Sequence, residues 1–208
     1  MKFKLFNAGL FLLLCVGASA QQPSSKASYV DPFIGTDGMG HTFPGACVPF
    51  GGVQLSPDTD TIPHNVNGKY QPRAYEYCAA YRYSDPTIVG FSHTHFSGTG
   101  HSDLGDILLM PTTGALRLNP GTADNPDFSH STEKASAGYY EVTLGDYGVK
   151  AQLTATTRVG IHKYSYPKGT DGQVILDLIH GIYNYDGKTL WAEVQVRNDT
   201  LLTGYRIT

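Results

Sequence analysis

The chain has 208 residues, with 15 Lys and Arg against 18 Asp and Glu, 24 Gly and 14 Tyr. Charged residues make up only 16% of the sequence and form no basic cluster, which excludes nucleic acid and an anionic membrane surface as natural partners. The many glycines and tyrosines are typical of an all-β protein with frequent turns, and the length suffices for one hydrophobic core.

The N-terminus has the pattern of a secretory signal peptide. Lys2 and Lys4 form a positive segment, an apolar run follows over residues 10–18, and Ala18-Ser19-Ala20 matches an A-x-A cleavage site. The apolar run is far shorter than the roughly 20 residues of a membrane-spanning helix. We therefore expect residues 1–20 to be a signal peptide cleaved after Ala20, and the protein to be exported to the periplasm or secreted without membrane insertion.

Residues 21–28 are polar and are expected to form a disordered leader. The following residues, 29–56, are rich in Gly and Pro, which excludes a long helix, and residues 58–71 are expected to be loop. No later segment has a convincing helical period. Strands are predicted from short apolar, β-branched or alternating runs at residues 52–56, 87–91, 106–111, 139–144, 149–157, 162–166, 173–179, 191–197 and 201–208.

The turn Gly145-Asp146-Tyr147-Gly148 is expected to join two of these strands as a hairpin. No turn or capping signal follows the last predicted strand before Thr208. The sequence therefore predicts a multi-strand antiparallel β-sandwich that is incomplete at its C-terminal edge, where an unpaired strand would be exposed.

Two glycine-rich segments carry the candidate site residues. Residues 90–105 place histidine, serine and threonine side chains among glycines, with few apolar side chains to bury. Glycine lets the backbone approach a ligand closely, so we interpret this segment as part of a sugar pocket. Residues 35–46 form a second such loop, which lacks the P-loop ending and suits either a ligand-facing loop or a structural Ω-loop.

The histidines and aspartates of residues 90–105 also allow catalytic interpretations. His93 and His95 are two residues apart and would share one face of a strand; with His101 and Asp103 they have the residue types of a zinc site. Structural hydrogen bonds and polar ligand contacts are the alternatives. Asp103 and Asp106 could form the carboxylate pair of a glycoside hydrolase, or they could bond the local backbone as turn residues.

Two cysteines, Cys47 and Cys78, remain after removal of the signal peptide. In an oxidising compartment they could form a disulfide. Two separate buried thiols are the alternative, and the sequence gives no geometry with which to choose.

Beyond these local patterns, the chain resembles the N-terminal domain of glycoside hydrolase family 92, the calcium-dependent exo-acting α-mannosidases. The resemblance covers essentially the whole mature chain, in order and with ordinary spacing. Its pieces are residues 29–36 (YVDPFIGT), 40–46 (GHTFPGA), 49–51 (PFG), 56–58 (SPD), 90–100 (GFSHTHFSGTG), 109–111 (LMP), 138–142 (GYYEV) and 153–160 (LTATTRVG).

The resemblance implies that residues 29–208 are an antiparallel β-sandwich of the supersandwich, galactose-mutarotase-like type. In the family this sandwich precedes a larger (α/α)6 barrel, which supplies chiefly the general acid, the general base and the calcium ligands. No such barrel follows in this sequence, so the chain is expected to be an N-terminal part without its C-terminal catalytic domain. The implied reaction is hydrolysis of terminal α-mannosyl linkages of mannans or N-glycans with inversion.

By resemblance, this domain is expected to contribute pocket wall and no catalytic residue or metal ligand. The expected sugar-contacting residues are Gly35, Thr36, His41, Thr42, Phe43, Tyr75, His93, His95, Ser97 and Gly98. The resemblance implies an α-1,2 linkage, with one departure from such family members. Residues 75–83 lack the tryptophan and glycine that those members often carry, which leaves Tyr75 or Tyr77 to stack on a leaving sugar. A stand-alone carbohydrate-binding module without catalysis is the alternative function.

Overall fold

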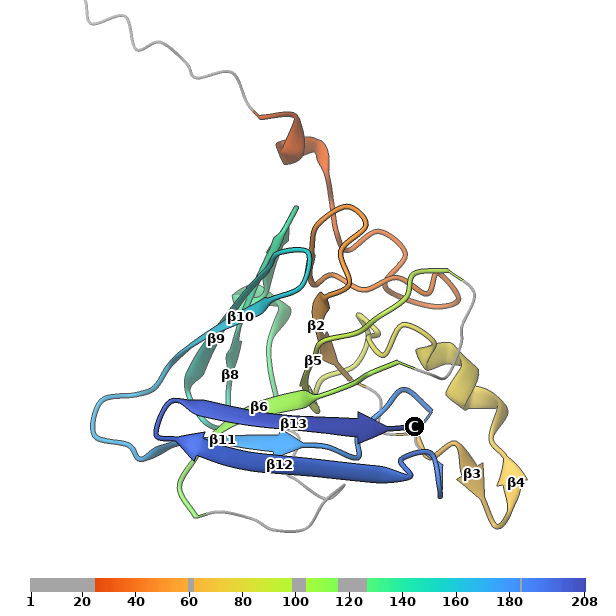
Figure 1. Ribbon diagram of the computed structural model, residues 1–208. Helices are drawn as coiled ribbons and strands as arrows, with labels where there is room; N and C mark the ends of the chain where they lie inside the picture. The colour runs from red at the N-terminus through yellow and green to blue at the C-terminus, as the bar shows by residue number, and fades with distance from the viewer. Residues whose placement is uncertain (1–24, 60–61, 99–103, 116–126, 184) are drawn as a thin grey trace, which may run out of the picture.

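The computed structural model describes residues 25–59, 62–98, 104–115, 127–183 and 185–208. Regular structure within these ranges is almost entirely β, with three short 3-10 helices (Figure 1). In chain order the elements are η1 (Lys26–Tyr29), β1 (Ala46–Cys47), β2 (Gln54–Asp58), β3 (Asn65–Val66), β4 (Lys69–Tyr70), η2 (Pro72–Tyr77), β5 (Gly90–Ser92), β6 (Leu108–Thr113), η3 (His130–Thr132), β7 (Lys134–Ser136), β8 (Tyr139–Leu144), β9 (Val149–Ala155), β10 (Gly160–Ser165), β11 (Gly172–Asp177), β12 (Trp191–Asn198) and β13 (Leu201–Ile207).

Two larger antiparallel sheets form the body of the protein. One has the strand order β1-β2-β5-β6-β11, and the other has the order β10-β9-β8-β7. Between them lies one core to which both sheets contribute large apolar side chains. The predicted antiparallel β-sandwich is therefore confirmed. The core residues are Leu55, Ile88, Phe91, Leu108, Met110, Tyr140, Val142, Leu144, Ala151 and Leu153.

The β8–β9 hairpin shows how the sequence pattern produces this core. Its register runs from Tyr139 opposite Thr154 to Leu144 opposite Val149, across the predicted turn at residues 145–148. Residues of β9 alternate between buried and partly buried along the strand. Because successive side chains of a strand point to opposite faces, this alternation sends one row of β9 into the core.

The segment predicted as loop at residues 58–71 contains a short hairpin instead. β3 pairs with β4, with Asn65 opposite Tyr70 and Val66 opposite Lys69. Asn67 and Gly68 between them have φ values of 51° and 74°, the left-handed conformations that a two-residue hairpin turn requires. The prediction failed because strands of two residues carry no alternating pattern, although Asn-Gly itself is a hairpin signal.

The C-terminal strands β12 and β13 form a two-stranded sheet that pairs with neither larger sheet in the described part of the chain. Large apolar side chains on both strands are exposed, including Trp191 at 56% and Val196 at 75%. In the described residues, no helix is both long and apolar enough to cross a membrane.

Candidate functional site

The two glycine-rich segments predicted from the sequence meet in the structure. The backbone N–H of Gly98 donates to the carbonyl oxygen of His41 at 2.8 Å. The ring of His95 lies 5.1 Å from the ring of Phe43, centroid to centroid. Segments about 50 residues apart in the sequence therefore lie in contact, because β1, where the first segment ends, and β5, where the second begins, both pair with β2.

Hydroxyl groups within residues 33–42 hold the first loop in shape. Thr36 Oγ1 donates to the carbonyl of Phe33 at 2.8 Å, and Thr42 Oγ1 donates to that of Ile34 at 2.7 Å. A Cβ at Gly40 would overlap the backbone of Gly35, so this close approach needs glycine. The predicted ligand-contacting threonines thus use their hydroxyl hydrogens inside the loop, and each keeps acceptor capacity on its oxygen.

His41 combines burial with an unused polar atom. The residue is 9% exposed and has a φ of 51°, and its Nε2 has no hydrogen-bond partner in the described part of the chain. The ring of Tyr75, from η2, meets it edge-on with centroids 5.0 Å apart. Since buried polar groups are almost always satisfied, this buried nitrogen without a partner is an exception.

The rim beside His41 is open to solvent. Ser97 and Gly98 are exposed, and Phe96 is 60% exposed. Gly98 has a φ of 101°, which a residue with a side chain rarely adopts, so this turn of the second segment also depends on glycine. Tyr75 is 38% exposed on the other side of His41. An imidazole, hydroxyl groups and aromatic rings therefore border one accessible edge.

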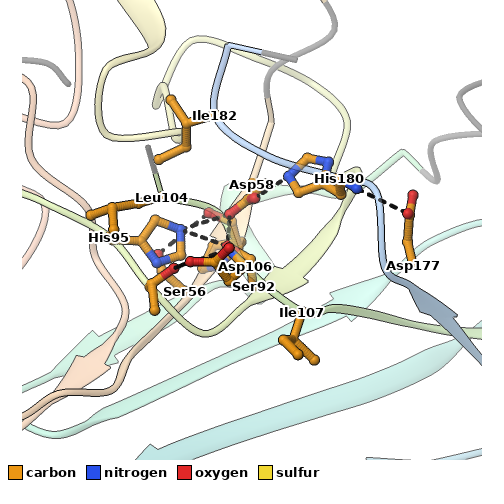
Figure 2. Close-up of polar contacts among 12 residues, drawn as sticks. Ser56, Asp58, Ser92, His95, Leu104, Asp106, Ile107, Asp177, His180 and Ile182 are labelled. Atoms are coloured by element: carbon orange, nitrogen blue, oxygen red, sulfur yellow. Dashed lines mark hydrogen bonds and ion pairs between the residues drawn. The ribbon is translucent and has the colours of Figure 1, made fainter. Parts of the chain in front are cut away.

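Behind this surface His95 joins a buried ionic cluster (Figure 2). Its Nδ1 lies 2.7 Å from the carbonyl oxygen of Gln54, and its Nε2 lies 2.7 Å from the carboxylate of Asp58. Both neighbours are acceptors, so both ring nitrogens must carry hydrogen and the ring is an imidazolium. The side chains of His95 and Asp58 are both fully buried.

Asp58 receives two further hydrogen bonds. Ser92 Oγ donates to its Oδ1 at 3.0 Å, and His180 Nε2 donates to its Oδ2 at 2.6 Å. Burial alone would raise the pKa of Asp58, but His95 and His180 outweigh burial and hold that pKa at about 2. Asp58 and His180 were not predicted as a pair, since they are far apart in the sequence and no local pattern links them.

His93 belongs to a different network from His95. Its Nδ1 donates to the carbonyl of Ile107 at 2.6 Å, which leaves its Nε2 as acceptor for His162 Nε2 at 3.1 Å. His162 Nδ1 in turn accepts from the hydroxyl of Tyr164 at 2.7 Å. Burial lowers the pKa of both rings, that of His162 to about 4. The pair is therefore neutral.

The expectation that His93 and His95 share one face is wrong. Strand β5 ends at Ser92, so the period of two no longer applies, and the two rings bind different partners. No group of three His, Cys, Asp or Glu side chains is placed to hold a metal ion in the described ranges. His101 and Asp103 of the zinc hypothesis lie outside those ranges.

Asp106 has structural partners. It accepts a hydrogen bond from Thr94 Oγ1 at 2.8 Å, its own N–H donates back to that oxygen, and Arg206 Nη2 lies 3.5 Å from its Oδ1. The other carboxylate of the pair considered from the sequence, Asp103, lies outside the described ranges.

Cys47 and Cys78 are separate thiols that are not joined by a disulfide. Cys78 is buried, and its Sγ lies 2.7 Å from the hydroxyl of Tyr183. Cys47 is half-buried at the start of the first sheet. The alternative of two separate thiols is the one that the structure contains.

Comparisons with known proteins extend this picture. A profile described as the glycosyl hydrolase family 92 N-terminal domain matches residues 29–208. A family GH92 α-mannosidase from Bacteroides thetaiotaomicron, solved in complex with mannoimidazole, is similar over 86% of this chain, with 40% identity and a TM-score of 0.75. A family GH92 inverting mannosidase from the same organism is similar over 73% of this chain, with 28% identity and a TM-score of 0.56.

An uncharacterized secreted glycosidase from Arthroderma benhamiae is 26% identical over 74% of this chain. The chain spans 19% of the length of that relative, and 23% and 19% of the two mannosidases. The similarity thus concerns one part of much longer proteins. Since the family profile covers nearly all of the described residues, the chain belongs to glycosyl hydrolase family 92 and corresponds to the N-terminal domain of that family.

Proposed function

We propose that this chain forms one wall of a cleft that binds the terminal mannose of mannans or N-glycans in an exported α-mannosidase. The observation that carries the proposal is the junction of the two glycine-rich segments, where Gly98 bonds His41 and His41 presents an unpartnered Nε2 beside Tyr75. Hydrogen-bonding side chains next to an aromatic ring suit a sugar, which has hydroxyl groups on its rim and apolar faces.

Each residue on the wall has a proposed part. His41 would bond a sugar hydroxyl through its Nε2, and Tyr75 would stack on the leaving sugar. Gly35, Gly98 and Ser97 would let the sugar approach the backbone, while Thr36, Thr42, Phe43 and His95 keep the wall in shape through the contacts described above. His93 lies within the other histidine network, so we propose for it no direct contact with the sugar.

The catalytic carboxylates and the calcium ion are proposed to be held outside this chain. Asp106 already has Thr94 and Arg206 as partners, and Asp58 is fully buried among histidines. In the described residues, no group of three His, Cys, Asp or Glu side chains is placed to hold a metal ion. In the proposal, the calcium ligands therefore come from another part of the protein.

Inversion, α-1,2 linkage and export are finer parts of the proposal. The relative described as an inverting mannosidase supports inversion. The relative described as secreted, together with the signal pattern of residues 1–20, supports export after cleavage at Ala20. The α-1,2 linkage is supported only by the general resemblance, because the tryptophan often found in such family members is replaced by tyrosines near Tyr75.

The test is an NMR titration of the 208-residue chain with α-1,2-mannobiose. We expect saturable shift changes at millimolar sugar, centred on His41, Tyr75 and Gly98, and their loss in His41→Ala. A matched control is His130→Ala, since His130 lies outside this wall and bonds Glu133. No response to mannobiose, or a response unchanged in His41→Ala, would contradict the proposal.

An activity assay separates the wall from a complete enzyme. With calcium present, the 208-residue chain should release no mannose from α-1,2-mannobiose, because a glycosidase needs an acid and a base on opposite faces of the sugar. Release above a blank would contradict the assignment of the carboxylates to another part of the protein.

A further inference from the structure

A group of tyrosines lies next to the proposed wall and is not used by it. We call this group the tyrosine strip: Tyr70, Tyr75, Tyr183 and Tyr185, arranged around His64. The ring of His64 lies 5.1 Å from that of Tyr70, 5.6 Å from that of Tyr183 and 5.3 Å from that of Tyr185. The strip is assembled from β4, η2 and the segment that follows β11, so only the fold brings it together.

The strip is continuous with the His41 surface. Tyr75 contacts His41 edge-on, and the carbonyl of Tyr75 accepts from Cys78 Sγ at 2.7 Å. The same sulfur lies 2.7 Å from the hydroxyl of Tyr183. Burial, the bond with Cys78 and the proximity of Tyr70 and Tyr75 together raise the pKa of Tyr183. These contacts give an order in space from His41 through Tyr75 and Tyr183 to Tyr70.

One tyrosine of the strip, Tyr183, is buried and held in place, and the other three rings are accessible. Tyr183 is only 6% exposed and has a φ of 53°, which is unusual for a bulky residue and shows that tertiary contacts hold it in place. Tyr70 is 50% exposed, and Tyr75 and Tyr185 are each 38% exposed. Rings held in this way can stack on a ligand without losing much side-chain freedom.

In the described residues, one unsatisfied nitrogen lies at the centre of the strip and another lies beside its Tyr75 end. His64 Nδ1 is buried and has no hydrogen-bond partner in the part of the chain that the structure describes, as is the case for His41 Nε2. His41 is more than nine-tenths buried. Aromatic surface interrupted by a few polar atoms is the usual composition of a small-molecule site.

The lack of strongly charged groups in the strip indicates which class of ligand it would bind. Its members are tyrosine and histidine side chains, with no carboxylate, ammonium or guanidinium group among them. The charged side chains nearest in sequence are of both signs, and Arg73 lies 3.6 Å from Glu76; they are Lys69, Arg73, Glu76 and Asp186. Such a surface favours a neutral polyhydroxylated ligand over an anionic one.

We propose that the tyrosine strip binds the third and fourth sugar residues of an unbranched neutral mannan chain, counted from the terminal mannose that the wall would hold. This proposal rests on the proposed function of the His41 wall, which would hold the terminal mannose. The strip extends from Tyr75, the proposed stacking partner of the leaving sugar, toward Tyr70 and Tyr185. The protein would therefore prefer longer oligosaccharides to a disaccharide.

The test compares α-1,2-mannobiose with α-1,2-mannotetraose by NMR titration of the 208-residue chain. We expect the tetrasaccharide to bind about threefold to tenfold more tightly, the range that corresponds to one aromatic stacking contact. In Tyr70→Ala and Tyr185→Ala this gain should disappear while mannobiose affinity stays the same. Tyr70→Phe should keep the gain, because it preserves the ring.

Tyr29→Ala is the matched control, since Tyr29 is 82% exposed. It lies in η1, the red-orange turn at the top of Figure 1, away from β3 and β4 at the lower right. Equal affinity for the two sugars would contradict sugar binding by the tyrosine strip and would leave the proposal for the His41 wall unaffected. Absence of binding to mannobiose would overturn the wall itself. A gain that survives both alanine variants would show that the additional sugars contact other residues, which also overturns the proposal.

Discussion

His93 and His95 are separated by one residue, and the structure uses them in opposite ways. His95 is a buried imidazolium between the carbonyl of Gln54 and the carboxylate of Asp58. His93 is a neutral ring that accepts from His162 and donates to a carbonyl. The difference arises from the partner on Nε2, which is a carboxylate for His95 and another imidazole for His93.

This contrast shows that residue type and spacing do not fix the chemistry of a histidine. The carboxylate beside His95 stabilises the charged ring, whereas burial beside a second imidazole favours neutral rings. Both networks lie near the end of β5. The charged network supports the wall, and the neutral network lies on the side of β10. Substitutions at three positions test this contrast.

The largest effect is expected from Asp58→Ala. The change leaves His95 and His180 facing a buried space without their counter-ion, which should lower the free energy of unfolding by about 3–5 kcal/mol. Urea unfolding at pH 7, followed by circular dichroism, measures it. Asp171→Ala is the control, since Asp171 is exposed and should change stability by less than about 0.5 kcal/mol.

A cost below about 1 kcal/mol for Asp58→Ala would contradict the ionic description of the cluster. Asp58→Asn, which keeps the shape but not the charge, should fall between the wild type and Asp58→Ala. If Asp58→Asn were as stable as the wild type, hydrogen bonding and not charge would hold His95.

The next effect is a dependence of stability on pH from His162. Its folded pKa of about 4 lies below the ordinary value of 6.5, so below pH 6.5 the unfolded chain takes up the proton more readily. Stability should therefore fall as the pH is lowered from about 6.5 to 4, by about 2 kcal/mol after allowance for partial exposure. His162→Phe should weaken this dependence in urea titrations at several pH values, and the part due to the lowered pKa of His93 should remain.

Asp58 provides an internal comparison, because its pKa shift affects stability over a different pH range. Its folded pKa of about 2 lies below the ordinary 3.8, so its contribution is present above about pH 3.8 and is lost as the pH falls toward 2. An equal loss of stability between pH 6.5 and 4 in the wild type and His162→Phe would show that His162 is not the group responsible.

The smallest effect is expected from Tyr164→Phe. The hydroxyl of Tyr164 donates to His162 Nδ1 at 2.7 Å, and its removal should cost about 1 kcal/mol in the free energy of unfolding. The nitrogen NMR shifts of His162 should change while those of His95 stay constant. Tyr205→Phe is the control, since Tyr205 is 53% exposed; a similar cost in both variants would contradict the proposed hydrogen-bonded chain.

The fold was predictable where the sequence alternates. The strand at residues 139–144 has the predicted bounds, and β9, β10, β11, β12 and β13 differ from prediction by one or two residues at their ends. Alternation is local information, because burial of one face requires every second residue to be apolar. The two-residue strands β1, β3 and β4 lack such a signal and were missed.

The candidate site was predictable only in part. Glycines and hydroxyl groups identified both loops, and these do meet at Gly98 and His41. The sequence also indicated the family, since several long motifs occur in order. It did not identify Asp58 as the partner of His95 and His180, nor His162 as the partner of His93, because those pairs join residues that are 37 to 122 positions apart.

By itself, the sequence determined the β-rich composition, the positions of the longer strands and the membership in family 92. The tertiary structure alone decided which histidine is charged, which polar atoms lack a partner and which tyrosines gather around His64. The physical reason is that strand patterns depend on neighbours two residues away, whereas protonation and hydrogen-bond satisfaction depend on groups that folding brings within about 3 Å.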